Sequence, residues 1–397
     1  MNRTCPLAYL AIALAAAATF SCDSNDSSSP PPAPPAKTLK VLFVGNSYTF
    51  GRLDPVMSYD ATNVHDLTAS FAAANPTGTN PWEPHPWGGV PGIFKVMTVQ
   101  AGLDYDVSIS TRNAASLRGH FLNTANNDWD LRGNVASQTW DIVVLQELSD
   151  GALPPGKGKN ANLASFKAYA NQFERFIHEG AAQTYTEVQL FGSLEACTAA
   201  RLSEEQCTTT RTIPANPNAS PATKVYLTET WARPDMVFAH KITTPDKSSP
   251  TGSPIVDPSS SGGDATLYYT SLDGMTTDLR ASVASAAAEN PKFVGVIPVG
   301  DAFQRAVDQN LVRSGAFYDA NGVFTVEQPG DPINLWWLDS THASKYGSYL
   351  DALLQFGSIT GRDPRSLGEG ERAARDLGIA PNDALTLQRV ASAQLGF

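Results

Sequence analysis

Five short runs of apolar and often β-branched residues recur along the chain. Each run is apolar nearly throughout, which is typical of parallel strands that are covered on both faces. The runs span residues 39–44, 105–110, 141–146, 187–191 and 293–299. Stretches with the apolar period of helices lie between most of them, at 93–101, 163–180 and 272–289. This alternation predicts an α/β fold with a five-stranded parallel sheet between two layers of helices.

After the fifth run the pattern becomes mainly helical. Helices are predicted at 302–312, 343–356 and 384–395, and a hairpin at 316–326 that turns at Asn321-Gly322. Two segments break the alternation. The segment of about 195–266 is rich in Thr, Ser, Pro and Gly, and we interpret it as a surface excursion of a single domain spanning 38–397. A shorter insertion lies at about 63–92.

The N-terminal residues indicate export. Arg3 precedes an apolar run at 6–20 that is too short and small-sided to span a membrane, which predicts a signal peptide at 1–21. The run ends in Thr-Phe-Ser-Cys22, which resembles a bacterial lipoprotein signal, although Thr stands where Leu is usual. Cys22 would then carry lipid, and cleavage nearby without lipid is the alternative. Residues 22–37 are rich in Ser and Pro and predict an extended tether, so we expect a secreted or envelope protein.

The overall charge narrows the possible partners. A formal net charge of -11 argues against a nucleic-acid partner and against adsorption to an anionic membrane, so contact with a membrane is expected only through the lipid anchor. Two of the four cysteines, Cys5 and Cys22, belong to the signal region. Cys197 and Cys207 are expected to form a disulfide in an oxidising compartment, with two free thiols as the alternative.

Ser47 is the first candidate for chemistry. It follows the first predicted strand in the sequence Gly45-Asn46-Ser47. In an open parallel sheet, ligands bind beyond the carboxyl ends of the strands, so the Ser47 hydroxyl would point into that crevice. Its own N–H could face a developing oxyanion. The alternative is that Ser47 only caps the next helix.

Asp339 and His342 form the second candidate. Their spacing of three residues brings both side chains to the same side of one turn. The carboxylate can then accept a hydrogen bond from Nδ1 of the imidazole, which leaves Nε2 free to take a proton from a serine. Asp339 could instead cap the helix that follows.

The combination of Gly45-Asn46-Ser47 after the first strand with Asp339-x-x-His342 before a late helix resembles the SGNH (GDSL-type) hydrolases. Those enzymes usually have Asp where this chain has Asn46. The resemblance covers about residues 40–361. It implies a flavodoxin-like, three-layer α/β/α sandwich and a catalytic triad of Ser47, His342 and Asp339. It also implies hydrolysis of small acyl esters, often acetyl groups on carbohydrates, without a metal or another cofactor.

The same resemblance implies an oxyanion hole. Besides the N–H of Ser47, it would contain the N–H of Ala114, at a position where the family has Gly, and the side-chain amide of Gln146. The third family block is here Gln146-Glu147-Leu148-Ser149-Asp150, which is similar to the variant found in carbohydrate acetylesterases. Gln146 could alternatively be a satisfied polar residue at the end of a strand.

Four further residues are candidates for binding an acylated carbohydrate or another small ester. Trp82, Trp87 and Trp231 could stack on sugar rings, and Arg233 could bind the carboxylate of a uronic acid. Packed loops are the alternative for the tryptophans. Two other functions remain open from the sequence. One is a surface-anchored glycan-binding protein that has kept the fold without catalysis, and the other is a lysophospholipase or thioesterase.

Overall fold

The computed structural model describes residues 37–74, 83–123, 130–245, 254–256, 263–326, 328 and 330–397. The predicted signal peptide, Cys22, most of the tether and Trp82 lie outside the described residues. Residues Lys37–Phe397 group into one unit by their contacts. Within the described ranges, no helix is both long enough and apolar enough to cross a membrane.

The centre of this unit is a parallel sheet, which confirms the predicted α/β class. It has six strands rather than five, in the order β10-β7-β4-β1-β3-β2. The strands are β1 (Leu39–Gly45), β2 (His65–Asp66), β3 (Tyr105–Thr111), β4 (Ile142–Gln146), β7 (Lys224–Glu229) and β10 (Phe293–Pro298). If the short edge strand β2 is left out and the other five strands are numbered 1 to 5 along the chain, their order across the sheet is 2-1-3-4-5. This is the flavodoxin order.

The prediction of the fourth strand, at residues 187–191, was wrong. Residues 187–191 form helix α7 (Glu187–Phe191), which begins at a capping box between Thr186 and Gln189. The true strand, β7, lies inside the segment interpreted as a surface excursion, and it pairs with β4 and β10. The extra strand β2 lies in the shorter insertion and pairs with β3.

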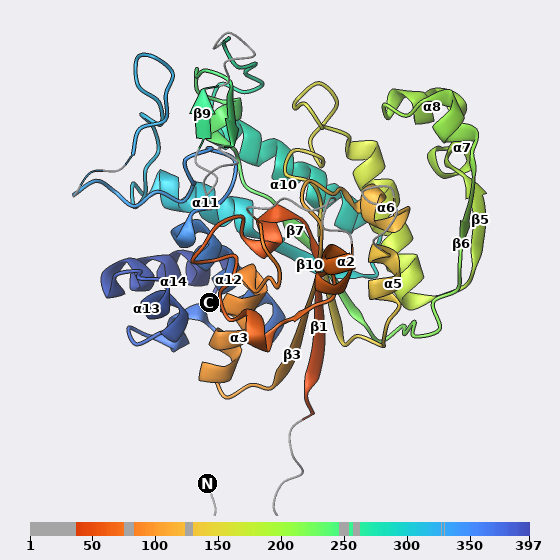
Figure 1. The fold of residues 1–397 in the computed structure, drawn as a ribbon, viewed down its shortest axis with the longest axis horizontal. Helices are drawn as coiled ribbons and strands as arrows, with labels where there is room; N and C mark the ends of the chain where they lie inside the picture. The colour runs from red at the N-terminus through yellow and green to blue at the C-terminus, as the bar shows by residue number, and fades with distance from the viewer. Residues whose placement is uncertain are drawn as a thin grey trace, which may run out of the picture. The chain divides into compact units, whose positions relative to one another are not determined.

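Helices cover both faces of the sheet (Figure 1). On one side lie α3 (Gly89–Gln100), α12 (Lys345–Thr360), α13 (Arg372–Asp376) and α14 (Pro381–Leu395). On the other side lie α4 (Leu117–Phe121), α5 (Leu131–Val135), α6 (Leu163–His178) and α10 (Leu272–Glu289), and α11 (Val299–Asp308) packs between α10 and α12. All six predicted helices are present, with ends that differ by about one turn. The predicted hairpin is a turn closed by one bridge, between Tyr318 and Phe324.

A separate two-stranded ribbon and three short helices lie between residues 183 and 213, partly before and partly within the predicted excursion. Strands β5 (Gln183–Thr186) and β6 (Thr210–Ile213) pair in antiparallel fashion and carry α7, α8 (Leu194–Ala199) and α9 (Glu204–Thr208) (Figure 1). A disulfide joins Cys197 to Cys207, whose Cα atoms lie 6.0 Å apart. The remaining elements are α1 (Ser47–Phe50), α2 (Ala69–Ala74), β8 (Thr243–Pro245), β9 (Pro254–Val256) and the 3-10 turns Ala61–Asn63, Pro234–Met236 and Pro364–Leu367.

Candidate active site

Ser47 lies on a tight turn at the carboxyl end of β1, where it begins the short helix α1. Asn46 caps this helix, because its Oδ1 accepts a hydrogen bond from the N–H of Tyr48 at 3.1 Å. Gly45 allows the turn to pack closely, since a Cβ there would come within 2.2 Å of the Thr49 hydroxyl oxygen and 2.6 Å of Gln146 Oε1. The turn therefore holds Ser47 at the edge of the sheet where ligands bind in this fold class.

The Asn46 side chain also joins three loops. Its Nδ2 donates to the carbonyl of Ala115 at 3.0 Å and to the carbonyl of Glu147 at 3.3 Å. These carbonyls follow β3 and β4, the strands on either side of β1. A carboxylate at this position could keep the helix cap but could not donate to either carbonyl. The amide of Asn46, which a carboxylate could not replace, is therefore part of the hydrogen bonding that joins these loops.

We expect Asn46→Asp, which introduces the residue expected from the sequence resemblance, to destabilise this protein. Two carbonyl oxygens would then face a buried carboxylate, and the lost donors would cost about 1–3 kcal/mol of unfolding free energy. Denaturant unfolding of Asn46→Asp beside the wild type at pH 7 measures this loss. Equal or greater stability of the variant would show that the two amide hydrogen bonds contribute nothing.

The structure brings Ser47 together with Asp339 and His342, although Ser47 and His342 are 295 positions apart in the sequence. Ser47 Oγ lies 2.8 Å from His342 Nε2, and His342 Nδ1 lies 2.5 Å from Asp339 Oδ2. Burial alone would raise the pKa of Asp339, but His342 and nearby N–H groups lower it to about 2. The carboxylate is therefore ionised and can only accept, which assigns the proton to Nδ1 and leaves the lone pair of Nε2 facing Ser47.

Asp339 also shapes the loop that carries His342. Its Oδ1 accepts hydrogen bonds from the N–H groups of Thr341 at 3.0 Å and His342 at 2.9 Å. The two carboxylate oxygens therefore have separate partners, one on the backbone and one on the imidazole. Asp339 thus closes the turn and contacts the ring, and it does not cap the helix that follows, because the N-cap of α12 is Ser344.

Trp231 packs against the loop that carries His342. It is only 1% exposed, and its ring stacks on Tyr48 at a centroid distance of 4.0 Å. Trp231 Nε1 and the Tyr48 hydroxyl both donate to the carbonyl of Thr341, at 3.1 and 2.7 Å. Trp231 thus contacts the site through the His342 loop and presents no open face to a sugar, which corrects its predicted role.

Trp87 is likewise buried, at 3% exposure, in a stack between Phe50 and His85. It cannot form the predicted wall of an open sugar site. Arg233 does border a cavity, but its guanidinium is already held by Asp235 at 2.9 Å, Ser149 at 3.0 Å and Thr341 Oγ1 at 3.1 Å. A substrate carboxylate would therefore have to compete with Asp235.

The predicted oxyanion donors differ in their surroundings. Ala114 adopts a left-handed backbone with φ of 56°, the conformation that favours Gly, at some cost in strain. The Gln146 side chain is directed at the turn that carries Ser47. Its Oε1 accepts from Asn46 N–H at 3.3 Å and from the Thr49 hydroxyl at 2.9 Å, and its Nε2 contacts the Glu147 carbonyl. In this structure Gln146 braces the nucleophile turn instead of pointing toward an oxyanion.

Two buried groups near the turn have structural contacts. The His120 Nε2 donates to the Gly45 carbonyl at 2.6 Å, and burial lowers the pKa of His120 to about 4. Burial raises the pKa of Glu147 to about 7, against two hydrogen bonds from the N–H groups of Leu117 and Leu148. Both side chains hold loop backbone at the carboxyl edge of the sheet.

Arg52 is the residue at this site that the sequence analysis missed. Its Nη1 lies 3.4 Å from His342 Nε2, and its Nε lies 3.4 Å from the carboxylate of Glu83. It lies five positions after Ser47, just past the end of α1. A cation placed so soon after the candidate nucleophile was the signal in the sequence, but no periodic pattern marks it.

A polar cavity of about 500 Å³ borders Asp339 and His342. Its lining includes Asp150, Asn160, Arg233, Asp235, Thr341 and His342. These side chains offer both donors and acceptors beside the imidazole. Among the residues that the structure describes, no three His, Cys, Asp or Glu side chains group as metal ligands.

Comparisons with known proteins give likenesses of fold. No protein-family model matches the chain, and no curated protein matches it in sequence. The solved structures similar to it include a putative SGNH hydrolase from Slackia heliotrinireducens, with 16% identity, a TM-score of 0.35 and coverage of 81% of this chain and 100% of that chain. A DUF4886 family protein from Bacteroides uniformis has 14% identity, a TM-score of 0.39 and coverage of 91% and 96%. An aryl esterase from M. smegmatis has 12% identity, a TM-score of 0.33 and coverage of 82% and 99%. At these values the likenesses assign no activity.

Proposed function

We propose that this protein is a serine ester hydrolase of the SGNH type that acts on acyl esters of carbohydrates. The observation that carries the proposal is the unbroken line of short contacts from Ser47 Oγ through His342 to an ionised Asp339. If Asp339 only capped a helix, a contact between His342 and a serine hydroxyl would not be needed. A serine hydroxyl on the other nitrogen of the same imidazole is what nucleophilic catalysis requires.

The reaction would proceed in two halves. Ser47 Oγ attacks the ester carbonyl while its proton passes to His342 Nε2, and the resulting imidazolium is stabilised by Asp339. In this proposal the N–H groups of Ser47 and Ala114 donate hydrogen bonds to the oxyanion. The alcohol then leaves with the proton from Nε2, and the acyl group stays on Ser47. Water repeats the sequence, which releases the acid and returns the proton to Ser47.

The polar cavity supports a carbohydrate as the alcohol part of the ester. Sugar hydroxyls both donate and accept hydrogen bonds, and the lining beside His342 supplies carboxylates, an amide and a guanidinium. The expected export of the chain agrees with a substrate outside the cell.

The proposal predicts release of p-nitrophenol from a panel of p-nitrophenyl esters with acyl chains from C2 to C12. Turnover should be abolished by covalent modification of Ser47, and mass spectrometry of a quenched reaction should show one acyl group on the Ser47 peptide. If the pure protein hydrolyses neither these esters nor acetylated sugars, and yet binds glycans, the fold has been kept for binding alone.

A further inference from the structure

The loop that carries Asp339 and His342 has a second side. The N–H of Trp337 donates to the His342 carbonyl at 2.8 Å, and Trp336 forms a bridge with Ala343, so residues 336–343 close into a narrow hairpin. The tip of this hairpin borders the polar cavity described above. Its base borders a second cavity of about 440 Å³. The hairpin therefore separates two cavities of different character.

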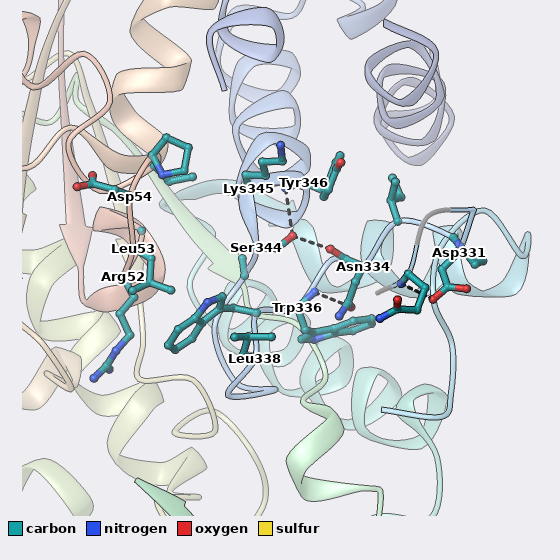
Figure 2. Close-up of a pocket in the computed structure, with 18 residues that line it drawn as sticks. Arg52, Leu53, Asp54, Asp331, Asn334, Trp336, Leu338, Ser344, Lys345 and Tyr346 are labelled. Atoms are coloured by element: carbon teal, nitrogen blue, oxygen red, sulfur yellow. Dashed lines mark hydrogen bonds between the residues drawn. The ribbon is translucent and has the colours of Figure 1, made fainter. Parts of the chain in front are cut away.

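The second cavity is mainly apolar. Its lining includes half-buried side chains of Leu53, Ile333, Trp337, Leu338, Ala343 and Tyr346. Figure 2 shows the cavity with Leu53 and Leu338 among its lining residues, and with the start of α12 held to the 331–338 segment by hydrogen bonds. The Ser344 hydroxyl donates to the Asn334 carbonyl at 2.6 Å and accepts from the N–H of Tyr346 at 3.1 Å. These bonds fix two walls before any ligand binds.

Arg52 stands between the two cavities. It lines both of them, and its Nη1 lies 3.4 Å from His342 Nε2. The next residues, from Leu53 to Val56, line only the apolar cavity and follow directly after the nucleophile helix. Ser47 itself lines neither cavity, and Arg52 provides the link, because it contacts His342 Nε2, which faces Ser47, and borders both cavities. An ester held at Ser47 would reach the two cavities past Arg52.

We propose that the apolar cavity binds the acyl part of the substrate, and that this part is a hydrocarbon chain of about six to ten carbons. The inference rests on the proposed function and names the acyl class for the same site. At about 30 Å³ for a water-sized group, the cavity holds on the order of ten methylenes, whereas an acetyl group would leave most of it empty. Each buried methylene favours binding by up to about fourfold, so this half of the ester belongs with the apolar walls.

The test compares 6-O-octanoylglucose with 6-O-acetylglucose, both below the critical micelle concentration of the octanoyl ester. Acid release by the full chain is followed in a pH-stat. We expect kcat/KM for the octanoyl ester to exceed that for the acetyl ester by about tenfold or more. Ile333→Trp fills the cavity and should lower this ratio at least tenfold. Leu53→Gln keeps the volume, makes one wall polar, and should lower the ratio in the same direction.

Leu311 provides matched controls, because it is 36% exposed and lines neither cavity. Leu311→Trp and Leu311→Gln should keep the ratio of the wild type. A wild type that prefers the acetyl ester overturns the acyl cavity while the ester hydrolase stands. The same conclusion follows if Ile333→Trp and Leu53→Gln both fold and leave the ratio unchanged. Hydrolysis of neither ester would instead overturn the proposed function.

Discussion

Replacing Ser47 by alanine should lower kcat for ester hydrolysis by about 10³-fold or more. The hydroxyl is the group whose proton His342 Nε2 is placed to accept at 2.8 Å, and Ala offers no atom to carry the acyl group. Steady-state rates on the best ester of the C2 to C12 panel measure the loss. Binding should change little, so a non-hydrolysable substrate analogue should keep its Kd.

The folded state should tolerate Ser47→Ala. Of the hydrogen bonds that the Ser47 hydroxyl makes to described residues, the contact with His342 is the one observed, and the turn itself is held by Asn46 and Gly45. Thermal unfolding should therefore match the wild type closely. Ser137→Ala is the control, because Ser137 is exposed and its hydroxyl donates to the Asn134 carbonyl, away from the triad. Turnover by Ser47→Ala equal to that of Ser137→Ala would exclude Ser47 as the nucleophile.

The sheet was largely predictable because β1, β4 and β10 are apolar nearly throughout, and in β3 Tyr105, Val107 and Ile109 alternate with polar residues. These four strands lie where the runs predicted them. The run at 187–191, Glu-Val-Gln-Leu-Phe, also alternates polar and apolar residues, and so short a run cannot be separated from a helix by periodicity. The capping box between Thr186 and Gln189 was the local signal for a helix. Strand β7 was missed because its six residues stand within a long Thr-, Ser- and Pro-rich segment.

The candidate site was predictable to the extent that it depends on strand ends and local spacing. The position of Ser47 after β1 and the three-residue spacing of Asp339 and His342 carry that information. Residue type alone failed for Trp87 and Trp231, because a tryptophan serves equally in a core stack and at a sugar site, and only tertiary packing distinguishes them. Arg52 was missed because no pattern in the sequence marks it, and only the tertiary fold brings it to His342.

The contacts of Asp339 make Asp339→Asn the sharpest test of the triad. In the variant, one oxygen can still accept from the N–H groups of Thr341 and His342, so the turn should survive. The amide nitrogen then takes the place of Oδ2 and donates toward Nδ1 of the imidazole. This favours the tautomer with its proton on Nε2, which cannot accept the proton of Ser47. Flipping the amide gives no rescue, because its NH₂ would then face two N–H donors.

We expect Asp339→Asn to lower kcat roughly 10- to 10³-fold. This is less than the loss of about 10⁴ that the same change of the triad Asp causes in a serine protease. His342→Ala should cost at least as much, and the double variant little more than the worse single one, because the two residues act as a unit. Stability at pH 7 should fall in Asp339→Asn by up to about 2.5 kcal/mol, the free energy that corresponds to a pKa lowered from 3.8 to about 2. Since the folded pKa of Asp339 is lowered to about 2 from an ordinary 3.8, its stabilising charge is present above pH 4 and lost as the pH falls toward 2. The stability difference between wild type and variant should therefore shrink over that range.

An Asp339→Asn protein that melts early at pH 7 but keeps the kcat of the wild type would mean that Asp339 only holds the turn, and another carboxylate would have to orient His342.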